Sequence, residues 1–255
     1  MEGKRSVPTT LSRTEIHVWW AVLPTPVALN DLVKVLSPDE ARRAGRYRRN
    51  EDATRFVTAR ATLRRLLGEY LGEPPSSIRF SYSRAGRPSV LYPLVPDLDI
   101  SISHSAGAVL IGLSRGRRIG ADVEYISPTF PFSEVAANSF AQEERDILES
   151  VSDVRKRNLF FALWTAREAL AKATGLGLTV QLADVGLALR YSPEGAIQVV
   201  HPKHGPYQCE CFTPLPRYAA AVAYSGSLCE VRLLAYESPG SCTQANCASR
   251  KHPNV

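Results

Sequence analysis

The sequence predicts an α/β fold (α+β) built from two similar α/β lobes. Two observations support this prediction. The order strand, helices, strands occurs once in each half of the chain, and 44% of the 255 residues are hydrophobic, which is ample for a core. No internal sequence repeat is detectable. We expect an N-terminal lobe at residues 1–115, a C-terminal lobe at 116–237 and a disordered tail at 238–255, where the sequence is polar and aperiodic.

The N-terminal half starts with an expected strand at residues 16–23. The segment Ser37-Pro38-Asp39-Glu40 predicts the first turn of a helix, because its serine, proline and glutamate have the spacing of a capping box. Apolar residues at helical spacing predict an amphipathic helix at 52–71, which Gly72 ends. Short alternating or apolar runs predict strands at 78–82, 98–102 and 108–113.

The C-terminal half is expected to resume with a strand at 118–126, after which Pro128 and Pro131 break the chain. Helical patterns follow at 133–150 and 154–174, and the glycines after residue 174 end the second pattern. The remaining sequence predicts strands at 185–189, 197–200, 207–212, 219–223 and 231–236.

The net charge of +6 is concentrated in one segment of the N-terminal half. Nine arginines lie between residues 42 and 65, against the acids Glu51 and Asp52: they are Arg42, Arg43, Arg46, Arg48, Arg49, Arg55, Arg60, Arg64 and Arg65. Such a cluster indicates either a solvated helix face or an anion site for nucleic acid, a phosphate-rich small molecule or an acidic partner. The arginines alone do not distinguish these alternatives.

The chain has no stretch that approaches the roughly 18 consecutive apolar residues of a membrane span. No apolar signal-peptide core follows Lys4 and Arg5. The five cysteines have no metal-ligand spacing, and their spacing does not favour a disulfide framework. We therefore expect a cytoplasmic protein without a membrane partner.

Three carboxylates and one ammonium have a spacing that favours chemistry. Asp122 and Glu124 stand two residues apart in an expected strand and so point to one face, and Gly120 places them near a bend that a ligand can approach. Glu168 and Lys172 stand four residues apart on one face of an expected helix. Solvated acids and a helix-stabilising ion pair are the structural alternatives. Together, however, these groups can hold a hard divalent cation against a diphosphate.

Two further segments carry possible ligands for phosphate. Ser103, His104 and Ser105 end an expected strand. A serine beside a histidine suggests a hydrolase, but neighbouring residues in a strand point to opposite faces, so phosphate binding by Ser103, His104 and backbone N–H groups fits better. In the loop Gly86-Arg87-Pro88 the backbone can approach a flat base while Arg87 meets a phosphate.

In their order and spacing these motifs resemble those of the Sfp-type 4′-phosphopantetheinyl transferases. The matching segments are Arg42 to Phe56, Gly86 to Pro88, Ser101 to Ser105, Gly120 to Glu124, Phe140 to Glu144, Trp164 to Lys172, and Gly175 to Leu178. The chain departs from the family pattern in having Ser101 for asparagine, Ala121 for a β-branched residue, and Arg87 and Arg167 for lysines. Arginine keeps the charge of lysine but adds a planar fork, which changes the contacts that residue 87 can make.

The resemblance implies a pseudo-twofold arrangement of the lobes, with coenzyme A in the cleft between them. It implies the transfer of 4′-phosphopantetheine from coenzyme A to a serine of an apo acyl or peptidyl carrier protein, with release of adenosine 3′,5′-bisphosphate. Mg²⁺ is the implied cofactor, with Mn²⁺ as an alternative, and a monomer is expected. The rivals are a basic nucleic-acid-binding module, which leaves the three acids unexplained, and a Ser/His hydrolase, which would act without coenzyme A.

The resemblance also implies roles for individual residues. Mg²⁺ is expected on Asp122, Glu124 and Glu168, and Glu168 is a ligand, the base that accepts the proton of the incoming serine, or both. Lys172 is expected to neutralise charge on the diphosphate. The expected coenzyme A contacts are Arg43 at the 3′-phosphate, with Arg46, Arg48 and Arg55 as alternatives. Gly86, Arg87 and Pro88 are expected at the adenine end, and Ser103, His104 and Lys172 at the phosphates. The carrier is expected near Gly175 and near Phe130, Phe132 and Phe140.

Overall fold

The computed structural model describes residues 10–23, 26–84, 86–175, 188–191, 197–200 and 207–237. The first half contains β1 (Glu15–Val22), α1 (Pro26–Val33), α2 (Pro38–Ala44), α3 (Asn50–Leu71), β2 (Arg79–Tyr82), β3 (Pro88–Tyr92), β4 (Leu98–Ser105) and β5 (Ala108–Arg115). The second half contains β6 (Ile119–Tyr125), α4 (Phe132–Ser139), α5 (Gln142–Glu149), α6 (Asp153–Thr174), β7 (Ala188–Tyr191), β8 (Ile197–Val200), β9 (Tyr207–Phe212), β10 (Tyr218–Ser225) and β11 (Glu230–Ala235).

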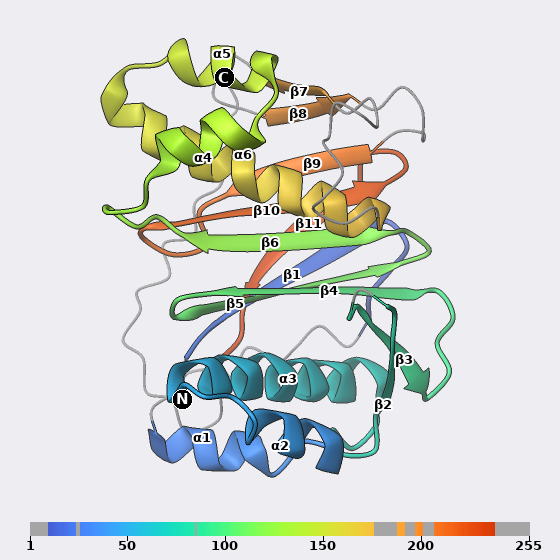
Figure 1. Ribbon diagram of the computed structural model, residues 1–255. Coiled ribbons are helices and arrows are strands. Elements are labelled where there is room, and N and C mark those ends of the chain that lie inside the picture. The colour runs from blue at the N-terminus through green and yellow to red at the C-terminus, as the bar shows by residue number, and fades with distance from the viewer. Residues whose placement is uncertain are drawn as a thin grey trace, which may run out of the picture.

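Two sheets lie between two long helices (Figure 1). Helix α3 covers the four-stranded sheet β11-β1-β5-β4, and α6 covers the three-stranded sheet β6-β10-β9. Leu63 of α3 and Leu163 of α6 belong to the apolar clusters that join each helix to its sheet. A third cluster, which includes Leu110 and Val123, fills the space between the sheets. The expected mixed α/β fold class is confirmed.

The chain passes between the two sheets twice. It leaves the first sheet after β5 and enters the second with β6, and it returns after β10, because β11 pairs in parallel with β1. Seven of the eight residues of β5 are buried, since this strand has neighbours within its sheet and packing on both faces. The last described strand therefore ties the end of the second half to the sheet that contains the first strand.

The edge strands β4 and β6 lie side by side where the two sheets meet (Figure 1). They are joined by side chains at alternate positions of β4, which share one face of that strand. Asp99 accepts the backbone N–H of Ile119, and Ser101 Oγ accepts that of Ala121 at 2.8 Å. We call this line of contacts, formed by Asp99, Ser101, Ser103 and Ser105 toward β6, the seam.

Helix α6 lies directly against β6 at Gly120. A Cβ atom built on Gly120 would lie 1.8 Å from the carbonyl oxygen of Ala169 and 2.6 Å from the backbone nitrogen of Ala173. The close approach that Gly120 permits in this structure is therefore that of the helix backbone. This contact fixes the height of α6 over β6, and with it the positions of the helix residues above the seam.

The expected helices begin and end close to their predicted positions, apart from the pattern at 133–150, and the structure adds α1, which was not expected. Ser37 and Glu40 form the expected capping box at α2, and α3 ends at Gly72. The helical pattern at 133–150 forms two helices, because Phe140 between α4 and α5 has an extended backbone. Its ring stacks on Phe160 with the centroids 5.2 Å apart, so the residue at the break belongs to the core.

Some expectations fall on parts of the chain that the structure does not describe. These include residues 176–184 and the expected tail at 238–255. The expected strand at 197–200 is present as β8. Within the described ranges, no helix is both long enough and apolar enough to span a bilayer.

Candidate active site

Asp122 and Glu124 both face β4 across the seam, as expected for alternate residues of one strand. Ser103 Oγ donates a hydrogen bond to Asp122 Oδ1 at 2.7 Å, and Ser105 Oγ donates one to Glu124 Oε2 at 2.6 Å. Asp122 is 3% exposed, and its second oxygen, Oδ2, is buried without a hydrogen-bond partner in the described part of the chain. The sequence did not show that the two serines would hold the two acids.

Helix α6 brings Glu168 and Lys172 to the same place. Lys172 Nζ lies 2.7 Å from Asp122 Oδ1 and donates a second hydrogen bond to the carbonyl oxygen of Ala121 at 3.1 Å. The pKa of Glu168 is raised to about 7, chiefly by burial and in addition by the charges of Asp122 and Glu124, while Lys172 opposes this rise. Burial also raises the pKa of Glu124. The three carboxylates thus form one coupled group with more negative charge than Lys172 neutralises.

The donor set suits a hard cation in its chemistry, since all three groups offer carboxylate oxygens. In the described ranges, however, no three His, Cys, Asp or Glu side chains are arranged to hold a metal ion. Ser103 and Lys172 bind Asp122, and Ser105 binds Glu124. Oδ2 of Asp122 has no hydrogen-bond donor among the described residues, and the pKa of Glu168 is raised first by burial and then by the charges of Asp122 and Glu124. A cation would therefore fit after small movements of these side chains.

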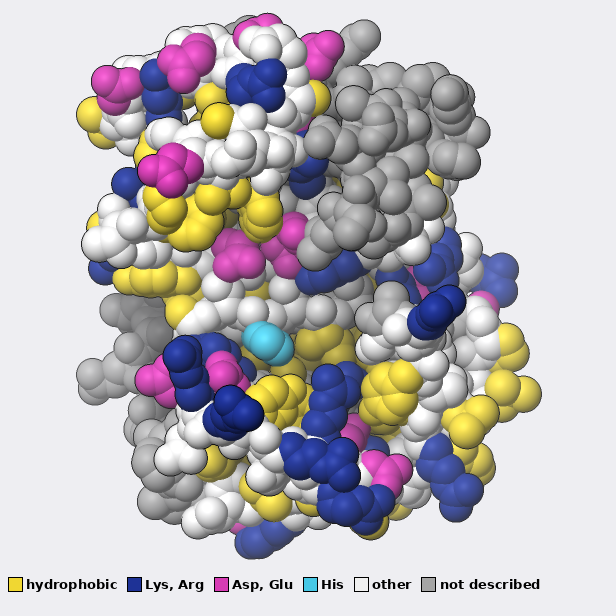
Figure 2. Space-filling view, in the orientation of Figure 1, with side chains coloured by type: hydrophobic (Ala, Val, Ile, Leu, Met, Phe, Trp, Pro, Cys, Tyr) yellow, Lys and Arg dark blue, Asp and Glu magenta, His cyan; other side chains and the backbone are white. Residues whose placement is uncertain are grey.

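A basic surface faces the acids across the seam. Figure 2 shows a histidine side chain between acidic side chains above and lysine or arginine side chains below. Partial desolvation lowers the pKa of His104, and the positive charges of Arg55, Lys172 and Arg60 lower it further. An anion bound here would meet several cations at once.

The arginines of the basic segment differ in their surroundings. Arg64 is 2% exposed, and its Nε lies 2.6 Å from Glu40 Oε2, so its charge is paired. Arg43 is exposed and lies over the ring of Phe56 at 5.0 Å from its centroid. Arg60 is 8% exposed and lies over Tyr82, but its Nη1 has no hydrogen-bond partner among the described residues. Desolvation lowers the pKa of Arg60.

The sequence analysis predicted Arg43 as the contact of the 3′-phosphate and named Arg60 only as one of the clustered arginines. One signal was present: Arg60 follows Phe56 by four residues, and both lie on the buried face of α3. An arginine on the apolar face of an amphipathic helix needs an acceptor for its N–H groups. Arg64 has one in Glu40, whereas Nη1 of Arg60 has none among the described residues.

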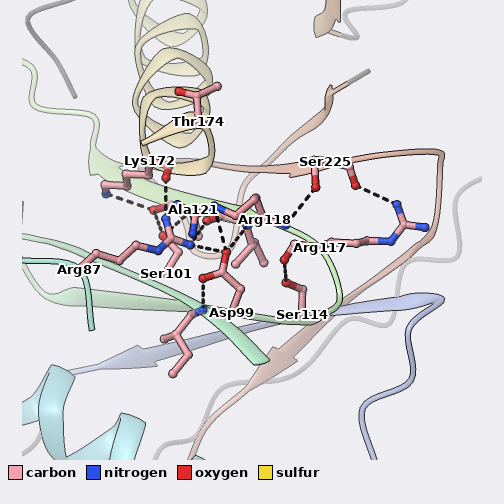
Figure 3. Close-up of polar contacts among 12 residues, drawn as sticks. Arg87, Asp99, Ser101, Ser114, Arg117, Arg118, Ala121, Lys172, Thr174 and Ser225 are labelled. Atoms are coloured by element: carbon pink, nitrogen blue, oxygen red, sulfur yellow. Dashed lines mark hydrogen bonds and ion pairs between the residues drawn. The ribbon is translucent and has the colours of Figure 1, made fainter. Parts of the chain in front are cut away.

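Arg87 makes its contacts within the protein. Its guanidinium donates hydrogen bonds to Asp99 Oδ2 at 2.8 Å and to the backbone carbonyl oxygens of Lys172 and Ile119 (Figure 3). Gly86 has a positive φ of 79° in the turn before it, and Pro88 begins β3. The expected contact of this loop with coenzyme A stays a prediction.

The aromatic residues expected at the carrier are mostly part of the core. Phe140 is 2% exposed, stacks on Phe160 and lies under the guanidinium of Arg167, so it offers no surface. Arg167 also pairs with the buried carboxylate of Glu144. Phe130 and Phe132 are half-buried against the same cluster. Gly175 ends α6, and the residues that follow it lie outside the described ranges.

Comparison with known proteins identifies the family. A profile described as the 4′-phosphopantetheinyl transferase superfamily matches residues 118–223, and one described as the N-terminal part of 4′-phosphopantetheinyl transferase matches residues 19–114. The 4′-phosphopantetheinyl transferase HetI of a Nostoc species is 36% identical over 191 residues, which cover 74% of this chain and 80% of HetI. The chain belongs to the 4′-phosphopantetheinyl transferase superfamily. It is therefore an enzyme of this class.

Two further matches have lower sequence identity. The transferase Sfp of Bacillus subtilis is 28% identical over 189 residues, which cover 73% of this chain and 81% of Sfp. Among solved structures, a holo-(acyl-carrier-protein) synthase of Bacillus anthracis in complex with coenzyme A (3′,5′-ADP) matches with a TM-score of 0.34 and 16% identity, over 42% of this chain and 96% of that one.

Proposed function

We propose that this transferase moves 4′-phosphopantetheine from coenzyme A to a serine of an apo acyl or peptidyl carrier protein, with a divalent cation as cofactor. The observation that carries the proposal is the contact of Lys172 with Asp122 beside Glu124 and Glu168, opposite a basic surface. Coenzyme A carries a diphosphate and a separate 3′-phosphate. The acidic group with its cation suits the diphosphate, and the arginines suit the 3′-phosphate.

The reaction makes one bond to phosphorus and breaks another. The serine oxygen of the carrier attacks the β-phosphorus, the bond from that phosphorus to the bridging diphosphate oxygen breaks, and adenosine 3′,5′-bisphosphate leaves. The serine proton passes to a base. Positioning and charge neutralisation are expected to supply most of the rate increase.

The residues of the chain would divide this work. Asp122, Glu124 and Glu168 would hold Mg²⁺ or Mn²⁺, which when bound neutralises diphosphate oxygens. Lys172 would neutralise charge on the leaving diphosphate from the same side. Glu168 lies where a carboxylate can serve as a ligand, as the base for the serine, or as both. Arg43, Arg60 and His104 would bind the 3′-phosphate.

The contacts of the seam argue against the two rival functions. Ser103 and Ser105 donate their hydrogen bonds to carboxylates, which is not the arrangement of a nucleophile activated by His104. A nucleic acid laid over the arginines would meet the coupled acids at the seam, which repel its phosphates. Both sides of the seam come from one chain, which supports action as a monomer. A cytoplasmic location stays a prediction.

The direct test is mass spectrometry of purified apo-carriers incubated with the enzyme and coenzyme A. A carrier should gain about 340 Da, the mass of phosphopantetheine, with Mg²⁺ present and not with excess chelator. A carrier whose acceptor serine is changed to alanine is the matched control. Equal modification in chelator would remove the metal from the proposal. Ester hydrolysis without coenzyme A and without any carrier modification would favour the hydrolase.

A further inference from the structure

Arg87 joins three structural elements at the end of the seam. It directly precedes β3, its acceptor Asp99 belongs to β4, Ile119 begins β6, and Lys172 lies in the last turn of α6. Figure 3 shows the guanidinium between these partners. Among the described residues, Arg87 thus contacts both edge strands of the seam and the helix above them.

The contact with α6 is made to a carbonyl that needs a donor. The last four carbonyl groups of an α-helix lack intrahelical partners. In α6, the N–H of Gly175 satisfies the carbonyl of Ala171, and Nη1 of Arg87 satisfies that of Lys172. A positive charge at a helix C-terminus also interacts favourably with the helix dipole. Arg87 therefore holds the end of α6 where the helix would otherwise fray.

Both the backbone and the side-chain ammonium of Lys172 are therefore held in place. Its backbone carbonyl is bound by Arg87, and its ammonium is bound by Asp122 at 2.7 Å and by the carbonyl of Ala121. A shift of the last turn of α6 would move the ammonium away from Asp122. The geometry of the proposed diphosphate site thus depends on a residue that does not touch it.

Arg87 is itself fixed by its neighbours. Asp99 Oδ2 accepts both from Arg87 and from the backbone N–H of Ile119 at 3.0 Å. In the turn before β3, the N–H of Arg87 donates to Ser83 Oγ and its carbonyl accepts from the N–H of Ser83. The side chain is 16% exposed, and its Nε is buried, so little of the guanidinium faces solvent.

From these contacts we infer that Arg87, together with Asp99, is a positioning residue that sets Lys172 for the transfer reaction, rather than a ligand of coenzyme A. The inference rests on the proposed function. It also accounts for arginine at a position where the family pattern has lysine. A planar fork donates to several acceptors in fixed directions, whereas an ammonium acts as a compact point charge.

The test compares Arg87→Lys and Arg87→Ala with the exposed Arg84→Ala of the same turn as control. Both Arg87 variants should lower kcat at least about tenfold while coenzyme A binding, measured by calorimetry, stays within about threefold. Lysine should not rescue the rate, because it cannot span the three acceptors. A large loss of coenzyme A affinity in Arg87→Ala that lysine restores would instead make Arg87 a phosphate ligand and overturn the inference.

A second measurement does not depend on activity. Amide hydrogen exchange of a peptide covering the end of α6 should become faster in Arg87→Lys and in Asp99→Asn, and stay unchanged in Arg84→Ala. Asp99→Asn serves as the second route if an Arg87 variant fails to fold. Unchanged exchange in both variants overturns the inference even where the wild type is active. If the wild type is inactive but the Arg87 and Asp99 variants still show faster exchange at the end of α6, the result counts against the proposed function. It does not count against the role of Arg87 in holding the end of α6.

Discussion

Helices α3 and α6 are each 22 residues long, and each buries charged residues against its own sheet, but with opposite sign. On α3 the buried charges are arginines, whereas on α6 the buried charge is Glu168. The difference that matters is pairing. Arg64 is bound by Glu40, while Glu168 has no ion-pair partner among the described residues. A buried charge with a partner belongs to the fold, and one without a partner indicates a site for a ligand.

We expect the largest effect, a loss of turnover, from substitutions of the acids at and beside α6. Asp122→Ala should lower turnover by about 10²–10³-fold while leaving the fold intact, because the residue would help to hold the cation that neutralises charge in the reaction. Raised Mg²⁺ should rescue this variant in part, since its defect is in metal affinity. Glu168→Ala should lose a similar amount, and metal should not rescue it if Glu168 also accepts the serine proton.

Steady-state rates at several Mg²⁺ concentrations check this prediction, with the exposed Glu143→Ala of α5 as the control acid. Rescue of both variants to the same extent would make Glu168 only a ligand. Wild-type activity in the Asp122 variant would remove the whole site.

On the α3 side, the paired arginine should matter for stability. Arg64→Ala leaves the buried carboxylate of Glu40 without its partner, and breaking such a pair costs about 3–5 kcal/mol of unfolding free energy. Urea denaturation measures the change. The exposed Arg49→Ala is the matched control and should change stability by less than about 0.5 kcal/mol. Equal stability of the two variants would contradict the division between paired and unpaired charges.

The sequence predicts the local parts of this arrangement well. Ser37 and Glu40 are three residues apart, and Asp122 and Glu124 are two apart, so their spacing alone sets their geometry. The partners of the acids could not be predicted in this way. Ser105 reaches Glu124, and β11 reaches β1, only after distant segments pack together. Hydrophobic periodicity shows which face is buried but not which residue lies opposite.

The unpaired arginine should matter for ligand binding and less for the fold. Arg60→Ala and Arg43→Ala should each weaken coenzyme A binding by about 1.5–3 kcal/mol, which is the range of a charge-assisted hydrogen bond. Dephospho-coenzyme A lacks the 3′-phosphate, so its binding should change little. Calorimetry with both ligands tests this, with Arg49→Ala as control. An equal loss for both ligands would place the 3′-phosphate elsewhere.

The smallest expected effect is on the pH dependence of stability. It tests whether Glu168 is a metal ligand or only a buried acid. Without metal, burial and the nearby acids raise the pKa of Glu168 from 4.5 to about 7. Between these pH values the folded protein keeps a proton that the unfolded chain releases. The contribution of Glu168 to unfolding free energy therefore falls as pH rises from 4.5 to about 7, and Glu168→Gln should remove this slope. Thermal unfolding in chelator across this range measures the difference between the two proteins.

Added Mg²⁺ should flatten the wild-type slope, because a bound cation favours the carboxylate. If Mg²⁺ leaves the slope unchanged, Glu168 is a buried acid and not a metal ligand.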